Sequence, residues 1–254
     1  MADNNRHIKA VVFDLGETLL NFGQIETMRL FREGAKLSYD FLKGLGQPVG
    51  RFRFYCWRNL ITIRMHCWLA NITGKDPNAL RLLRRNGTKA GYQLEEQQWR
   101  ELVWLWYKPL RDICKSETDI VGTLTMLKDS GIKLGILSNT FVNDFALERH
   151  LREIEIVDFF PVRLYSYQFD FRKPDPRIFR IAADRIDIPL ENIMYVGDRI
   201  NMDIEPAIKL GMTAVLKSAY TNAGKEPPDG TWKIDRISEL PAIIEKINSQ
   251  LAPA

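Results

Sequence analysis

Short apolar runs alternate with helical patterns along most of this chain, and this alternation is the strongest restriction on its fold. The first run, Ile8 to Phe13, is rich in β-branched residues, as expected for a strand buried on both faces. Further strands are predicted at Ile132–Leu137, Ile193–Val196 and Thr213–Leu216, with helical patterns between them. Repeated strand–helix alternation implies a parallel sheet with helices on both faces. The sequence therefore predicts a doubly wound, Rossmann-like α/β domain.

The interval between the first and second predicted strands is helical throughout. Its helical patterns are broken by glycines and prolines, and Pro109 follows the last of them. The patterns cover about 25–43, 52–71, 77–85 and 95–107. We therefore expect an all-helical domain, residues 23–111, inserted into a sheet domain made of residues 1–22 and 112–254. In the sheet domain, helices are expected near 119–129, 144–151, 176–185 and 238–248, with one more ending at Leu210 and an extended piece near 162–166.

Composition and terminal sequence exclude several classes of protein. No run approaches the roughly 20 apolar residues that a membrane span needs, and the polar first ten residues lack the apolar core of a signal peptide. The three cysteines include no close pair, which suits a reducing compartment and excludes a CxxC site: Cys56, Cys67 and Cys114. We expect a cytoplasmic protein with no membrane partner. The three histidines, His7, His66 and His150, are expected to have structural or surface roles.

Polar residues stand where the predicted strands end, which is where open parallel sheets bind ligands. Four stations follow in order along the chain: Asp14, then Ser138 and Asn139, then Lys173, then Asp198 and Asp203. Three carboxylates at one sheet edge cannot all stay ionised without a cation, and Mg²⁺ is a hard ion that takes such ligands. Lys173 can hold Asp14 ionised. Ser138 and the amide of Asn139 can donate hydrogen bonds to phosphoryl oxygens.

These four stations resemble the four motifs of the haloacid dehalogenase superfamily, over roughly residues 8–22 and 115–250. The helical insertion sits where that family places its cap domain. The resemblance implies a Mg²⁺-dependent hydrolase that acts on a small phosphorylated molecule through an aspartyl-phosphate intermediate. It makes Asp14, Ser138 and Lys173 catalytic and Ser138, Asn139 and Lys173 substrate-binding. The implied metal ligands are Asp14, Asp198, Asp203 and the backbone carbonyl of Gly16.

One position departs from the family pattern. The first motif of the family usually carries a second Asp two residues after the nucleophile, as general acid and base, and this chain has Gly16 there, followed by Glu17. Three interpretations remain open. The first is a phosphatase in which Glu17, a cap residue or water carries the proton. The second is a metal-independent 2-haloacid dehalogenase, against which the retained Asp198 and Asp203 argue. The third is a core that binds a phosphorylated ligand or a protein partner with negligible turnover.

The insertion is basic: residues 43–94 contain ten Lys or Arg and one acid, Asp76, while the whole chain carries +4. Arginines alternate with aromatic residues over residues 51–71. Helical spacing places Arg51 and Arg58 on one stripe and Arg53 and Arg64 on another, about 200° away, so that no single basic face forms. Either these arginines are solvated around a helix whose aromatics pack inside the cap, or some face the catalytic cleft and attract anionic substrates. The tryptophans of residues 99–106 are expected in the cap core or an interface. Nucleic acid is not expected as a partner, because no recognition motif is present.

Overall fold

The computed structural model describes residues 7–249. Within them, six strands form one parallel sheet in the order β3-β2-β1-β4-β5-β6. The strands are β1 (Ala10–Phe13), β2 (Lys133–Ser138), β3 (Val162–Tyr165), β4 (Ile193–Gly197), β5 (Thr213–Lys217) and β6 (Trp232–Ile234). Strand β1 lies between β2 and β4, so the chain first winds to one side of β1 and then to the other. The expected doubly wound parallel sheet is confirmed.

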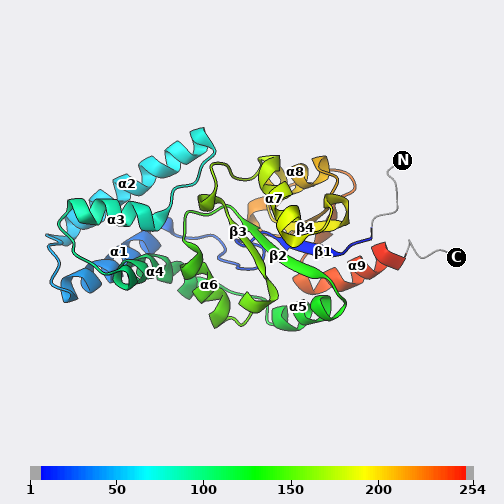
Figure 1. Ribbon diagram of the computed structural model, residues 1–254, viewed down its shortest axis with the longest axis horizontal. Coiled ribbons are helices and arrows are strands. Elements are labelled where there is room, and N and C mark those ends of the chain that lie inside the picture. Colours follow the sequence, from blue (N-terminus) through cyan, green and yellow to red (C-terminus); the bar gives the residue numbers. More distant parts are fainter. Residues whose placement is uncertain (1–6, 250–254) are drawn as a thin grey trace.

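Helices cover both faces of the sheet, as the apolar character of its strands requires (Figure 1). Residues of β1 alternate between two cores: Val11 and Phe13 pack with α5, α6 and α9, while Ala10 and Val12 pack with α7 and α8. The bounds of these helices are α5 (Ile120–Asp129), α6 (Asp144–Glu153), α7 (Pro176–Ile186), α8 (Glu205–Lys209) and α9 (Leu240–Ser249). Burial on both sides places the ends of β1, and whatever follows them, at the centre of the molecule.

Four helices between β1 and β2 form a separate unit at one end of the sheet (Figure 1). They are α1 (Thr27–Gly44), α2 (Phe52–Thr73), α3 (Ala79–Lys89) and α4 (Glu96–Ile113). This unit, called the cap below, has its own core, which includes Tyr55 and Trp99. Trp104, by contrast, is buried in the same cluster as the sheet residues, at the contact between cap and sheet domain. The tryptophans are thus in the cap core and the interface, as expected.

Two chain segments connect the cap to the sheet domain, and they pair with each other. Asn21 N–H donates to the Lys115 carbonyl at 3.0 Å, and Lys115 N–H donates to the Asn21 carbonyl at 2.8 Å. This isolated antiparallel bridge ties the entry and the exit of the cap together at one point. The connection is therefore backbone-bonded and does not depend on particular side chains.

Two expectations about helices and strands were wrong. Helix α4 does not end before Pro109 but continues through it to Ile113. Proline removes one helical hydrogen bond, yet the last turn is held by Leu110 against the main core and by Arg111 Nε, which donates to Glu153 at 2.5 Å. Strand β6 was not expected, because its three residues at the sheet edge are too short to show a period.

The outer surface of α2 also differs from expectation. Tyr55 is buried, but Phe54, Trp57 and Trp68 are 62–69% exposed and do not pack inside the cap. Their helical spacing places them on one stripe, together with Ile61 and Ile72, that faces away from α1 and α4. Among residues 7–249, no helix is both long and apolar enough to cross a membrane.

Candidate active site

The central three strands bring polar residues to one point. Asp14 directly follows β1, Ser138 ends β2, and Asp198 directly follows β4. Because these strands are neighbours in a parallel sheet, their carboxyl ends meet. Asp203 joins them from the short π-helix Ile200–Ile204 after β4, and a Cβ at Gly197 would lie 2.5 Å from the Asp203 side chain. Only glycine at position 197 lets Asp203 approach so closely.

The three carboxylates and Lys173 form one buried cluster. One oxygen from each of Asp14, Asp198 and Asp203 lies within 4.8 Å of the others. The Lys173 ammonium donates to Asp14 Oδ1 at 2.7 Å and to Asp203 Oδ1 at 2.6 Å. It also donates to the hydroxyl of Tyr195, a strand residue, at 3.0 Å. The fully ionised set of three acids and one lysine would carry a charge of −2, so a divalent cation would neutralise it.

Burial and mutual charge shift the pKa values in this cluster. Burial raises the pKa of Asp198 to about 7, and the negative charge of Asp14 adds to the effect. Burial also raises the pKa of Asp203, although Lys173 opposes this. Burial lowers the pKa of Lys173, but Asp14 and Asp203 outweigh it and hold that pKa well above its usual value. Lys173 is therefore positively charged here. A second cation would stabilise the ionised form of the carboxylates.

Asp198 is held by the loop after β5 and keeps one oxygen unused. The Thr221 hydroxyl donates to Asp198 Oδ2, and the Asn222 side-chain amide donates to the Asp198 carbonyl at 2.8 Å. Its other oxygen, Oδ1, is buried and has no hydrogen-bond partner among the described residues. Burying a carboxylate oxygen without a hydrogen-bond partner costs free energy. A cation that took this oxygen as a ligand would offset that cost. The donor set therefore fits Mg²⁺, which prefers carboxylate oxygens.

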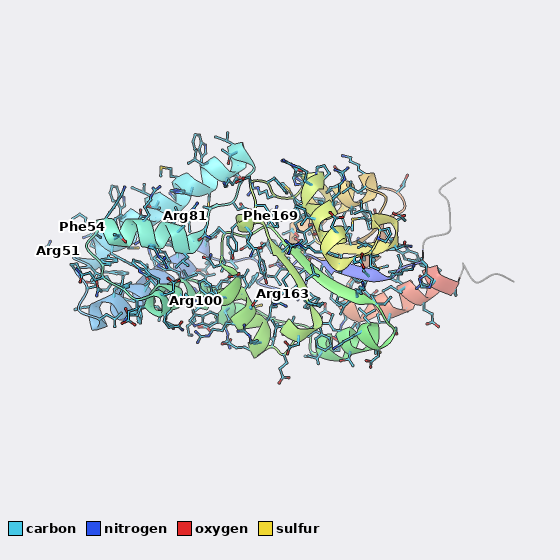
Figure 2. All side chains as sticks on the ribbon, in the orientation of Figure 1. Arg51, Phe54, Arg81, Arg100, Arg163 and Phe169 are labelled. Atoms are coloured by element: carbon cyan, nitrogen blue, oxygen red, sulfur yellow. The ribbon has the colours of Figure 1, made fainter. Side chains whose placement is uncertain are left out.

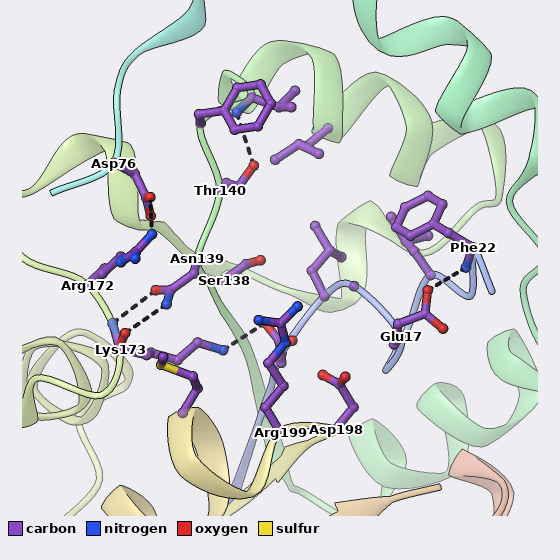
Figure 3. Close-up of a pocket in the computed structure, with 18 of the residues that line it drawn as sticks. Glu17, Phe22, Asp76, Ser138, Asn139, Thr140, Arg172, Lys173, Asp198 and Arg199 are labelled. Carbon is purple, nitrogen blue, oxygen red and sulfur yellow. Dashed lines mark hydrogen bonds and ion pairs between the residues drawn. The ribbon is translucent and has the colours of Figure 1, made fainter. Parts of the chain in front are cut away.

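A cavity of about 510 Å³ opens above this cluster, between the sheet edge and the cap. It is lined by all the expected site residues: Asp14, Gly16, Ser138, Asn139, Lys173, Asp198 and Asp203. The Asn139 side chain is already engaged, since it donates to the Lys173 carbonyl and accepts from the Lys173 N–H, both at 2.9 Å (Figure 3). What Asn139 can offer a ligand is therefore its backbone N–H, and its side chain positions Lys173.

Glu17 lies in the cavity wall but is turned away from the acid cluster (Figure 3). Its Oε1 accepts hydrogen bonds from the backbone N–H groups of Phe22 at 2.9 Å and Gly23 at 3.1 Å. Burial raises the pKa of Glu17, and these two hydrogen bonds oppose the shift. Glu17 also has a positive φ of 59°, which is uncommon outside glycine. Its carboxylate closes the loop that leads into the cap.

Two arginines at the cavity were not singled out in the sequence. Arg199 extends over the acid cluster from the residue after Asp198, and its guanidinium has no hydrogen-bond partner among residues 7–249 (Figure 3). Arg172 is engaged: it donates to Asp76 at 2.6 Å and to Asn71 at 2.9 Å, both from the cap. Asp76 is buried and also accepts from the Ser166 hydroxyl at 2.5 Å. In the sequence, only its neighbour indicates that either arginine belongs to the site: Arg172 precedes Lys173, and Arg199 follows Asp198.

The basic residues of the cap do not line the cavity. Among the described residues, the cationic side chains that line the cavity all come from the sheet domain: Arg172, Lys173 and Arg199. Arg51 lies at the end of the cap remote from the sheet, beside Phe54 (Figure 2). Arg58 donates to the Tyr92 hydroxyl at 3.0 Å, within the cap. These contacts favour the interpretation in which the cap arginines are structural or solvated.

Comparison with known proteins places this site in a family. The sequence model of the family described as haloacid dehalogenase-like hydrolase matches residues 8–211, which include every residue of the acid cluster. A glyceraldehyde 3-phosphate phosphatase of Methanopyrus kandleri is 33% identical over 140 residues, covering 52% of this chain and 58% of that protein. The chain thus matches little more than half of the length of that curated relative.

Solved structures share the fold of this chain over most of its length. A HAD phosphatase from Thermococcus onnurineus superposes with a TM-score of 0.61 at 21% identity, covering 93% of this chain and 98% of the other. A 2-haloacid dehalogenase from Pseudomonas syringae pv. Tomato superposes with a TM-score of 0.59 at 21% identity, covering 96% and 100%. At this identity the likeness shows the fold. Both kinds of hydrolase use it, so the site must distinguish them.

Proposed function

This chain belongs to the haloacid dehalogenase-like hydrolase family, and we propose that it is a Mg²⁺-dependent phosphatase acting on a small phosphorylated molecule. The observation that carries the proposal is the unpartnered, buried Oδ1 of Asp198 beside Asp14 and Asp203. A metal-independent dehalogenase would not need a buried cluster of charge −2 that a divalent cation would neutralise. Asp14, Asp198, Asp203 and the Gly16 carbonyl are the groups that would hold Mg²⁺. When bound, the ion would neutralise the cluster and orient a phosphoryl group.

Asp14 is the nucleophile in this proposal. The Lys173 ammonium donates a hydrogen bond to Asp14 Oδ1, which holds the carboxylate in place and leaves Oδ2 to attack phosphorus. The new bond joins Asp14 to phosphorus, and the bond from phosphorus to the ester oxygen breaks, so the leaving oxygen departs as an anion with the electron pair and takes a proton from water to give the alcohol. Water then attacks the aspartyl-phosphate and releases inorganic phosphate, restoring Asp14. Asn139 contributes by holding Lys173 at both backbone groups.

The remaining donors bind the phosphoryl oxygens. Ser138 ends β2 beside Asp14, and the backbone N–H of Asn139 follows it, so both can donate to oxygens that gain charge as the ester bond breaks. Arg199 adds a cation with no other partner among the described residues. A neutralised cluster together with Arg199 would meet a phosphate dianion with net positive charge. That balance favours phosphate over a monoanionic haloacid.

The test is release of inorganic phosphate from a panel of phosphate esters, with Mg²⁺ and with excess chelator. We expect Mg²⁺-dependent release, lost in Asp14→Asn with an unchanged far-UV circular dichroism spectrum. The exposed Asp129→Asn serves as the matched control and should keep full activity. Chloride release from 2-chloropropionate in chelator would instead establish the dehalogenase. Tight binding of phosphate esters without turnover of any of them would establish a binding protein.

A further inference from the structure

The cavity has a second side, and it is apolar. Besides the polar residues at the strand ends, the lining includes apolar side chains from the loop after β1, from α4, from the segment after β2 and from α6. They include Phe22, Tyr107, Leu110, Phe141, Val142 and Leu147. A phosphoryl group held at Asp14 would place the rest of the substrate against this wall, because the acid cluster and Lys173 occupy the other end. The wall therefore contacts the leaving group.

Of the polar side chains that the cap contributes to the cavity, Asp76 and Tyr107 are paired, and Asn71 is paired at its oxygen but not at its amide nitrogen among the described residues. The Tyr107 hydroxyl is hydrogen-bonded to His150 Nδ1 at 2.8 Å. Asp76 accepts from Arg172 and Ser166, and Asn71 accepts from Arg172. A leaving group rich in hydroxyls would exchange water for a wall that offers few free partners, and each unpaired hydroxyl would weaken binding. An apolar leaving group would gain from the same burial.

We propose that the substrate is a phosphate monoester whose leaving group is an apolar alcohol, aromatic or branched, rather than a sugar or a glycerol derivative. The inference rests on the proposed phosphatase function and names its substrate class. Gly16 agrees independently with an aromatic leaving group that is a phenol, since a phenol oxygen departs without a proton more readily than an alkoxide does. The cavity of about 510 Å³ has room for such a group beside the phosphoryl site.

Phosphonates separate binding to the wall from the ease of departure, because their carbon–phosphorus bond is not cleaved. Inhibition constants would be measured with Mg²⁺, against turnover of phenyl phosphate, for 2-phenylethylphosphonate, ethylphosphonate and 2,3-dihydroxypropylphosphonate. We expect the phenylethyl compound to bind at least about tenfold more tightly than the other two, since each missing apolar group in such a pocket is worth about tenfold or more. Equal binding of all three, or preference for the dihydroxypropyl compound, would overturn the proposal.

Two variants place the effect on the wall. Leu110→Asn and Val142→Asn lie on different elements, so misfolding of one leaves the other informative. Each should remove most of the phenylethyl preference while leaving inhibition by inorganic phosphate unchanged. Ile61→Asn makes a similar change on the exposed face of α2 and should alter neither constant. An unchanged preference in both wall variants would contradict the proposal, whereas a protein that cleaves no phosphate ester at all would contradict the phosphatase function itself.

Discussion

The Glu17 carboxylate accepts a hydrogen bond from the backbone N–H of Phe22, 2.9 Å away, and so closes the loop between β1 and the cap. Glu17 is the carboxylate nearest in sequence to Gly16, the position at which the chain departs from the family pattern. Its bonds tie it to the loop instead. The reaction at Asp14 is therefore expected to proceed with little protonation of the leaving oxygen.

A Gly16→Asp substitution should restore that protonation. A Cβ at Gly16 would have only Phe22 nearby, at 3.8 Å, and the residue has no positive φ, so the backbone accepts a side chain there. General acids contribute about 10²–10⁴ in rate, and the gain should fall mainly on poor leaving groups. We expect the ratio of kcat/KM for ethyl phosphate to that for 4-nitrophenyl phosphate to rise at least about tenfold. Glu17→Gln keeps the acceptor oxygen and should leave the ratio unchanged; a fall of that ratio in Glu17→Gln would identify Glu17 as the acid.

Thr221 should determine metal affinity without touching the reaction. Its hydroxyl binds Asp198 Oδ2 and orients that carboxylate, and losing such a support typically weakens metal binding about 10- to 100-fold. Thr221→Val should raise the Mg²⁺ concentration for half-maximal activity by about tenfold, with kcat at saturating Mg²⁺ nearly unchanged. Thr125→Val, on an exposed face of α5, should change neither quantity. A drop in kcat at saturating Mg²⁺ would mean that Thr221 acts on substrate instead.

Arg199 and the cap arginines should behave differently. Arg199 lines the cavity, whereas Arg53 is exposed on α2 and does not. Arg199→Gln should raise the inhibition constant of inorganic phosphate by about tenfold and weaken the salt dependence of kcat/KM, because a cation near the phosphoryl site is lost. Arg53→Gln should leave both measurements as in the wild type. An equal effect of the two substitutions would show that long-range attraction by the cap captures the substrate.

Acid should destabilise the protein through His150. Burial lowers the pKa of this histidine to about 4, and nearby Arg111 adds to the shift while Glu153 and Asp112 oppose it. In the unfolded chain His150 takes up a proton near pH 6.5, so between about pH 6.5 and 4 the unfolded state binds more protons and the free energy of unfolding falls as pH falls. The loss is roughly 3 kcal/mol over that range.

His150→Gln should make the free energy of unfolding less dependent on pH between 4 and 6.5, because glutamine does not titrate. Urea denaturation at several pH values measures this slope for both proteins. Above pH 7 the difference between them should be constant, since His150 is neutral in both states there. Parallel curves down to pH 4 would mean that another group carries the acid sensitivity.

The strand ends were predictable from the sequence because each of these expected strands is a short apolar run with the polar residue at issue within two positions of its end. Asp14, Ser138 and Asp198 needed no knowledge of tertiary contacts. Thr221 and Asp76 did, since each acts on a residue more than twenty positions away across a loop. Tyr195 resembled any apolar strand residue until its hydroxyl was placed beside Lys173. Pro109 led to a wrong prediction of where α4 ends, because packing of the last turn of the helix outweighs the local helix-breaking effect of proline.

The bridge between Asn21 and Lys115 and the contacts of Asp76 attach the cap at different sides of the cavity, with Phe22 near the first and Arg172 at the second (Figure 3). The bridge consists of backbone hydrogen bonds and holds the cap to the sheet domain on its side of the cavity. The contacts of Asp76 are made by side chains and hold the cap to the sheet domain on the other side of the cavity. If the cavity opens, we expect the opening on the Asp76 side, where the bonds of Asp76 to Arg172 and Ser166 and those of Asn143 to Asn78 and Leu80 would have to separate. A carboxylate that takes no part in bond cleavage would then affect how fast substrate enters and product leaves.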